Sequence, residues 1–121
     1  MKRILIVDDV KRIRGIYNRL LTAEGFEVIE ASSAGEAQEI LKRERIDLIL
    51  LDIKMPEADG SIVNISYEAV KLFRKKCKVI VTSVYSLGEQ KQIITEASDY
   101  YDKSQGIDIL LAKVREVLKD G

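Results

Sequence analysis

Short apolar runs alternate along the chain with longer segments in which apolar residues recur every three or four positions. Short apolar runs bounded by polar residues favour buried strands, and the longer spacing favours helices with one apolar side. We predict five strands, at residues 3–7, 26–31, 46–51, 78–82 and 99–102. Strands that alternate with helices in this way are typical of a parallel sheet covered by helices on both faces.

Helices are predicted between the strands. The first covers residues 11–23, and Gly25 follows it at the position where a left-handed residue ends many helices. Its apolar stripe consists of Ile13, Ile16, Tyr17, Leu20 and Leu21. Ser33 and Glu36 form a capping box that opens a second helix, which runs to about Arg43. Three more helices are predicted, at residues 66–76, 88–97 and 107–118.

The segment from Met55 to Asn64 fits a helix poorly. Pro56 and Gly60 interrupt it, and a helical stripe begins only after Ser66. We therefore predict a long loop before the third helix. Together these elements make residues 1–121 a single α/β domain with a doubly wound, five-stranded parallel sheet.

Composition excludes several kinds of chemistry. The 121 residues contain 20 basic and 20 acidic side chains, so net charge gives no reason to expect a nucleic-acid or membrane partner. Because the chain has no histidine, it cannot form a histidine-based nucleophile pair or an ordinary histidine metal site. The single cysteine, Cys77, excludes an internal disulfide. No stretch resembles a signal peptide or a membrane span, so we expect a soluble, cytoplasmic protein.

Charged and hydroxyl side chains stand at the ends of four predicted strands. Asp8 and Asp9 follow the first strand, Asp52 the third, Thr82 ends the fourth and Lys103 follows the fifth. Right-handed crossovers place the carboxyl ends of parallel strands on one edge of the sheet, so these side chains should meet there. An acidic pair alone could equally cap the first helix, and Thr82 or Lys103 alone would carry little meaning. The joint arrangement favours a functional site.

Three carboxylates at one place repel one another, and a divalent cation relieves that repulsion. Oxygen ligands without histidine or thiolate favour Mg²⁺, which leaves positions open for a phosphate. Thr82 offers a hydroxyl and Lys103 an ammonium that can contact phosphoryl oxygens. A carboxylate nucleophile, Mg²⁺ and a lysine together suit the formation of an aspartyl phosphate.

With these residues in place, the whole chain resembles the receiver domains of two-component response regulators. The matching motifs are Ile4-Leu5-Ile6-Val7-Asp8-Asp9, Leu51-Asp52-Ile53-Lys54-Met55-Pro56, Asp59-Gly60, Thr82 and Lys103. The resemblance implies the strand order 2-1-3-4-5. It also implies that Asp52 accepts a phosphoryl group from a sensor histidine kinase or a phosphotransfer protein, and that this transfer requires Mg²⁺.

The resemblance further assigns roles to single residues. Asp9, Asp52 and the backbone carbonyl of Lys54 would bind the metal directly, and Asp8 would act partly through water. Lys103 and Thr82 would contact the phosphoryl group, after which Tyr100, at the family's switch-aromatic position, would rotate. The surface of the fourth helix, fifth strand and fifth helix would then change shape for a downstream effector protein or an appended output domain. A tyrosine that fills its pocket permanently is the alternative for Tyr100.

The chain also departs from the family pattern. Ser104 stands where the family usually has a proline after a cis peptide bond, and we predict a trans bond because a cis bond before a residue other than proline costs about 2.5–4 kcal/mol. Lys54 and Val84 occupy the positions that tune phosphate loss, and neither can orient an attacking water. We therefore expect a long-lived aspartyl phosphate. Tyr85 and Tyr101 are candidate contact residues for a partner or a second copy of the chain, or simply exposed aromatics.

Other functions remain open at this point. A degenerate receiver could use the same surface for binding proteins without phosphorylation. An aspartate-nucleophile phosphatase would need Asp-x-Asp after its first strand, whereas Val10 follows the adjacent acids here. A flavodoxin-like flavin carrier would need a phosphate loop rich in hydroxyls and glycines at the same place.

Overall fold

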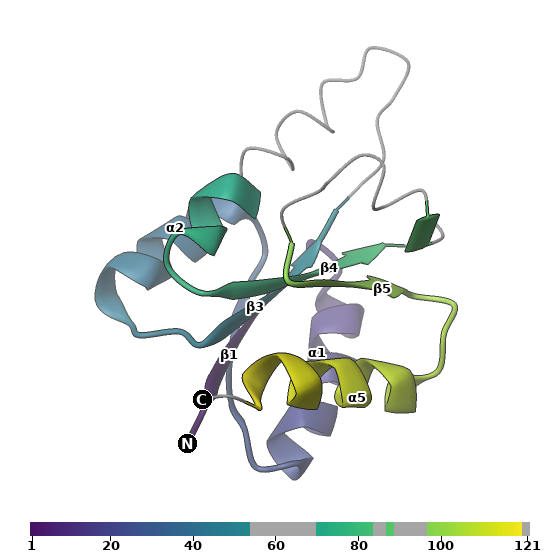
Figure 1. The fold of residues 1–121 in the computed structure, drawn as a ribbon. Helices are drawn as coiled ribbons and strands as arrows, with labels where there is room; N and C mark the ends of the chain where they lie inside the picture. The colour runs from purple at the N-terminus through teal and green to yellow at the C-terminus, as the bar shows by residue number, and fades with distance from the viewer. Residues whose placement is uncertain (54–69, 84–86, 89–96, 120–121) are drawn as a thin grey trace.

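The computed structural model describes residues 1–53, 70–83, 87–88 and 97–119 (Figure 1). Its strands are β1 (Arg3–Val7), β2 (Glu27–Ala31), β3 (Leu48–Asp52), β4 (Lys78–Ser83) and β5 (Asp99–Asp102). Its helices are α1 (Lys11–Ala23), α2 (Ala34–Arg43) and α5 (Ile107–Leu118). Residues 70–74 are also helical. None of the described helices combines the length and apolar character that a membrane-spanning segment requires.

All the strand pairs are parallel, and the order across the sheet is β2-β1-β3-β4-β5. This confirms the predicted order and fold class. The strands end in register: Val7 lies opposite both Ala31 and Leu51, and Asp52 lies opposite Thr82. The carboxyl ends of the central strands therefore form one straight edge, from which the loops with the candidate site residues depart.

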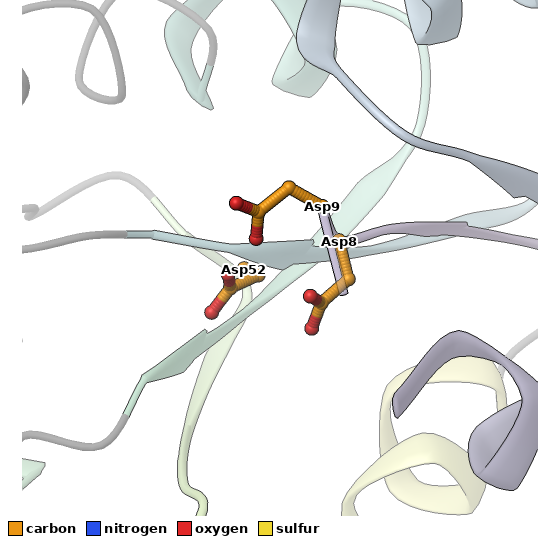
Figure 2. A group of neighbouring side chains, drawn as sticks. All are labelled: Asp8, Asp9 and Asp52. Carbon is orange, nitrogen blue, oxygen red and sulfur yellow. The ribbon is translucent and has the colours of Figure 1, made fainter. Parts of the chain in front are cut away.

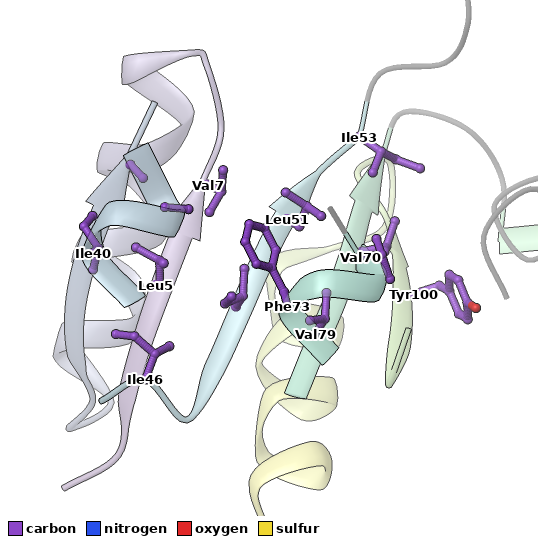
Figure 3. Packing of buried hydrophobic residues seen from close by; sticks show 14 residues of the cluster. Leu5, Val7, Ile40, Ile46, Leu51, Ile53, Val70, Phe73, Val79 and Tyr100 are labelled. Atoms are coloured by element: carbon purple, nitrogen blue, oxygen red, sulfur yellow. The ribbon is translucent and has the colours of Figure 1, made fainter. Parts of the chain in front are cut away.

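Two hydrophobic cores cover the two faces of the sheet, because successive side chains of a strand point to opposite sides. On one face, Leu5, Leu51 and Val79 pack with residues of α2 and with Phe73 (Figure 3). On the other face, Ile6 and Leu50 pack against Tyr17 of α1 and Val114 of α5. Since β1, β3 and β4 are buried on both sides, each contains a continuous apolar run, with polar residues only at the strand ends.

The end of α1 and the start of α2 follow the predicted local signals. Gly25 has a φ of +94°, its N–H donates to Thr22 O at 3.0 Å, and the next N–H donates to Leu21 O at 3.1 Å. This pair of bonds is the helix ending that glycine favours. At α2, Ser33 Oγ accepts the Glu36 N–H at 3.1 Å. The Glu36 carboxylate returns a bond to the N–H of Ser32, one residue earlier than the capping box predicts.

Several predicted boundaries differ from the structure. The second strand begins at Glu27 and the third covers Leu48–Asp52, because the residues before them belong to the connecting turns. Ile16 was expected in the buried stripe of α1, but it is 38% exposed because it lies at the edge of that stripe. The predicted loop at 55–64, the start of the third helix and most of the fourth lie outside the described residues.

Candidate functional site

The site residues come from aligned strand ends and share one face of the sheet. Asp52, the last residue of β3, continues the alternation of Leu48 and Leu50, whose side chains face α1 and α5. Asp8 continues Ile4 and Ile6 of β1 in the same way. The pattern of the buried strands thus directs both carboxylates to the same side.

The three predicted carboxylates meet at this edge. Each of Asp8, Asp9 and Asp52 offers an oxygen atom, and these atoms lie within 4.8 Å of one another. Figure 2 shows Asp8 and Asp9 leaving the end of β1 while Asp52 approaches from the neighbouring strand. Asp8 is only 3% exposed and Asp9 is exposed, so the cluster is open to solvent on one side.

Lys103 reaches the same cluster from the end of β5. Its Nζ lies 2.7 Å from Asp52 Oδ1 and 3.1 Å from Asp8 Oδ2, so one ammonium bridges two carboxylates. Its backbone N–H donates to Ser83 O at 2.7 Å, which extends the pairing of β5 with β4 by one residue. Burial lowers the pKa of Lys103, but the hydrogen bonds and charges of Asp52 and Asp8 outweigh it and leave that pKa raised.

The pKa of the Asp52 carboxyl group is changed by this environment. Burial raises the pKa of Asp52 to about 6, the hydrogen bond and charge of Lys103 oppose the shift, and the charges of Asp8 and Asp9 add to it. A carboxylate with this pKa is ionised at neutral pH. It is also poorly solvated, which suits a group that must act as a nucleophile.

Asp8 has structural contacts as well as a place in the cluster. Its Oδ1 accepts the N–H of Val10, the N-cap residue of α1, at 2.9 Å. Its carbonyl oxygen accepts from Arg14 Nη1 at 2.7 Å, and Arg14 Nε in turn donates to Glu30 of β2 at 3.1 Å. Asp8 therefore fixes the turn before α1, although α1 has no side-chain cap hydrogen bond, and its carboxylate also contacts Lys103.

Sequence analysis missed Arg14. A basic residue on an exposed helix is normally solvated, and nothing in the local sequence marks this one as different. The available signal was its position on the first turns of α1, close to the acidic loop, together with Glu30 on the adjacent strand. Arg14 ties α1, β2 and the backbone of the acidic loop together.

Thr82 and Tyr100 occupy the predicted strands but lie in different surroundings. Thr82 is 1% exposed, pairs in register with Asp52, and its carbonyl oxygen accepts the Ile53 N–H at 2.9 Å. Tyr100 is buried in the opposite core, the one that contains Phe73 (Figure 3). Thr82 and Tyr100 therefore lie on opposite faces of the sheet, on the paired strands β4 and β5.

The donor set fits a hard divalent cation. Three carboxylates supply oxygen ligands at a distance that small side-chain movements can close around one ion. Lys103 can compensate only one of the three negative charges. The backbone carbonyl of Lys54, the remaining expected ligand, lies outside the described residues, as do Val84 and Tyr85.

Two other expectations have clear outcomes. The Lys103–Ser104 peptide bond is trans, as predicted. Tyr101 was expected to be an exposed contact residue, which is wrong: it is 2% exposed and packs in the core beneath α1 and α5. Its position opposite Thr82 in the sheet turns its ring inward.

Comparisons with known proteins agree with this architecture. The family model of the response regulator receiver domain matches residues 4–115. A probable transcriptional regulator, ycf27, of Porphyra purpurea is 37% identical over 122 residues that cover 98% of this chain and 48% of that protein. The sporulation initiation phosphotransferase F of Bacillus subtilis is 31% identical, over 97% of this chain and 94% of its own. The chain spans about half the length of the transcriptional regulators that it matches.

Solved structures give the same result. The response regulator TrrA of Thermotoga maritima, crystallised with Mg²⁺ and BeF, superposes with a TM-score of 0.80 at 35% identity and covers 98% of this chain and 100% of its own. TrrA has also been crystallised with the histidine kinase ThkA, and this copy gives a TM-score of 0.79 over 98% of this chain and 99% of its own. The chain therefore belongs to the response regulator receiver domains of two-component signalling systems.

Proposed function

We propose that this domain accepts a phosphoryl group on Asp52 from a histidine kinase or a phosphotransfer protein, in a reaction that requires Mg²⁺. The observation that carries the proposal is the bridge from Lys103 to both Asp52 and Asp8, beside Asp9, at the aligned ends of the strands. This arrangement places a poorly solvated carboxylate next to a cation and a group of metal ligands. No single residue would justify the proposal.

The proposed transfer uses each side chain in a defined way. An Asp52 oxygen attacks the phosphorus of a phosphohistidine, a P–O bond forms and the P–N bond breaks, and the imidazole, whose other ring nitrogen takes a proton from solvent, leaves as a neutral group. Asp9, Asp52 and the Lys54 carbonyl would hold Mg²⁺, with Asp8 acting partly through water. Mg²⁺, when bound, neutralises charge on the transferring phosphoryl oxygens.

Lys103 and Thr82 would bind the product. The Lys103 ammonium already contacts Asp52 and would pair with a phosphoryl oxygen once that carboxylate is esterified. The buried Thr82 hydroxyl, on the strand next to Asp52, would donate to another. Phosphorylation adds negative charge and acceptor oxygens, so it favours the arrangement in which both residues lie closest to Asp52.

The proposed output is a change in the surface of α5, β5 and the helix expected over residues 88–97. Movement of Thr82 would allow Tyr100, which is already buried, to rotate within its core and so alter that surface for an effector protein or an appended output domain. A shift of the active population from 1:99 to 99:1 requires phosphorylation to favour the active arrangement by about 5.5 kcal/mol. Hydrogen bonds to charged groups contribute about 1.5–3 kcal/mol each, so the two contacts from Lys103 and Thr82 together are of the required order.

We further propose that the aspartyl phosphate is long-lived. Hydrolysis needs a side chain that orients water at Asp52, and neither Lys54 nor Val84 is an acid or an amide. The half-life of the phosphorylated protein should exceed that of relatives with a carboxylate or an amide at both positions, and Val84→Gln should shorten it. An equal or shorter half-life in the wild-type chain would contradict this proposal.

The decisive experiment is incubation with a small phosphodonor and MgCl₂, followed by measurement of the intact mass. We expect the wild-type protein to gain the mass of one phosphoryl group, and Asp52→Asn to gain none. Glu39→Gln, on the exposed side of α2, is the matched control and should behave like the wild type. The absence of a mass gain in the wild type, or an equal gain in Asp52→Asn, would contradict the function.

A further inference from the structure

The loop that follows β5 is held by a dense set of hydrogen bonds. Asp102 and Gln105 close a turn, with the Gln105 N–H donating to Asp102 O at 2.9 Å and the Asp102 N–H donating to Gln105 Oε1 at 3.2 Å. The Asp102 carboxylate also accepts from Ser104, from its N–H at 2.8 Å and from its hydroxyl at 2.7 Å. Lys103 is the one residue of this turn that points to the site.

Tyr101 connects the end of the turn, at Gln105 and Gly106, to the hydrophobic core. Its ring is buried with Tyr17 and Leu110, and its hydroxyl donates to the carbonyl of Gln105 at 2.7 Å, with the Gly106 carbonyl at 3.3 Å. Gly106 is the N-cap residue of α5. The hydroxyl therefore joins the strand before Lys103 to the helix start after it.

These bonds restrict where the Lys103 side chain can go. Its backbone N–H is fixed to Ser83, its ammonium to Asp8 and Asp52, and the chain on both sides of it by Tyr101 and Asp102. A lysine side chain has four rotatable bonds, so holding its ammonium in place requires a well-fixed backbone. The bonds around the turn provide that fixation.

We infer that Tyr101 and Asp102 are positioning residues that set the reach of Lys103 toward a phosphoryl group on Asp52. This inference rests on the proposed function of Lys103 and adds to it a structural cause. The Tyr101 hydroxyl and the Asp102 carboxylate bond to the turn, so both residues act through the backbone that carries Lys103.

The test separates metal binding from phosphoryl binding. Mg²⁺ affinity depends on the carboxylates, whereas fluoroberyllate, which imitates a phosphoryl group on an aspartate, also needs the ammonium. In Tyr101→Phe and Asp102→Ala we expect the affinity for fluoroberyllate at saturating Mg²⁺ to fall by about tenfold, the equivalent of one charge-assisted hydrogen bond. The affinity for Mg²⁺ should stay within about twofold of the wild type.

Ser98→Ala is the matched control, because it removes a hydroxyl that also bonds to the backbone, at Val79 N–H, but at the opposite end of β5 from the turn. It should leave both affinities at the wild-type level. Amide hydrogen exchange at Ser104 and Gln105 should rise in Tyr101→Phe and stay unchanged in Ser98→Ala. If Tyr101→Phe does not fold, Asp102→Ala decides the matter, since its side chain lies outside the core.

Each outcome has a distinct meaning. Wild-type fluoroberyllate affinity in Tyr101→Phe and Asp102→Ala would overturn the inference and leave the proposed function intact. A parallel loss of both affinities, or the same loss in Ser98→Ala, would also overturn it, because it would indicate general damage to the fold. Failure of the wild-type protein to bind fluoroberyllate would instead contradict the proposed function.

Discussion

The surroundings of Asp52 have opposing effects on its ionisation. Burial opposes ionisation of this carboxyl group and Lys103 favours it, with the result that its pKa is raised to about 6. Ionised Asp52 is what the proposed transfer needs, so the rate of phosphorylation and the affinity for Mg²⁺ should both fall as the pH drops through 6. Ionisation of Asp52 should, by contrast, lower the stability of the folded protein.

In the folded protein Asp52 binds its proton more tightly than in the unfolded chain, where its pKa is near 3.8. The folded state therefore holds more protons between these two values, and stability should decrease as the pH rises from 4 to above 6. Asp52→Asn removes this effect. In the presence of a chelator we expect it to gain up to about 3 kcal/mol at pH 7.5 relative to pH 4.

Urea unfolding of the wild type and Asp52→Asn at both pH values measures this difference, with Glu39→Gln as the control on the surface. A stability change in Asp52→Asn that is the same at pH 4 and pH 7.5 would show that the buried charge has no energetic cost.

Lys103 should affect the two proposed ligands in opposite directions. Its ammonium occupies Asp8 and Asp52, so Lys103→Met should bind Mg²⁺ more tightly, by about tenfold for the release of one such ion pair. Phosphorylation should become slower, because the phosphoryl group loses a cationic partner. Calorimetric titration with MgCl₂ and the rate of mass gain from a phosphodonor test the two halves, and weaker Mg²⁺ binding would contradict the first.

Single residues also show which features could be predicted from the sequence and which could not. Asp8, Asp9, Asp52 and Lys103 were found because each follows a strand, and strand ends are visible as changes from apolar to polar residues. Tyr101 was misjudged because β5 has only four residues, of which two adjacent ones are tyrosines, so alternation does not reveal which side is deeply buried. Such contacts depend on three-dimensional packing.

The helices α1 and α2 follow local sequence rules closely enough that the effects of single substitutions in them can be predicted. Gly15 lies inside α1 with open space where a side chain would begin, whereas Gly25 just beyond the helix has a φ of +94°. The same glycine-to-alanine change therefore meets opposite conditions at positions ten residues apart.

We expect Gly15→Ala to stabilise the protein by about 0.5–1 kcal/mol, because glycine is a poor helix former. Gly25→Ala should destabilise it by about 1–2 kcal/mol, because the left-handed conformation is strained for any other residue. Urea unfolding of the two variants beside the wild type provides the comparison. Destabilisation by Gly15→Ala, or no effect of Gly25→Ala, would contradict the local account.

Helix and strand types were predictable because their signals are local, and their boundaries were less so. The apolar run before β3 includes Ile46, which is buried yet precedes the strand, since the hydrogen bonds of Asp47 start the pairing with β1. Burial and strand pairing are separate properties, and a hydrophobic pattern reports only the first.

For the whole molecule, the sheet edge should couple metal binding to global stability. The ligands come from β1 and β3, so Mg²⁺ can bind strongly only when these strands are paired. A concentration of Mg²⁺ one hundred times the dissociation constant should stabilise the fold by about 2.7 kcal/mol. This should appear in urea unfolding of the wild type and vanish in Asp8→Asn and Asp52→Asn, and retention of the shift in both variants would place the metal elsewhere.

The bridge from Lys103 to Asp8 joins residues 95 positions apart. Contacts of such long range form late, because the intervening chain must first lose most of its freedom. We therefore expect the ammonium to arrive with β5, one of the two edge strands, after β1 and β3 have brought together the two carboxylates that it contacts. During synthesis, the acidic cluster of this domain is therefore encoded within the first half of the domain, while the cation that completes the cluster is added only after the first four strands.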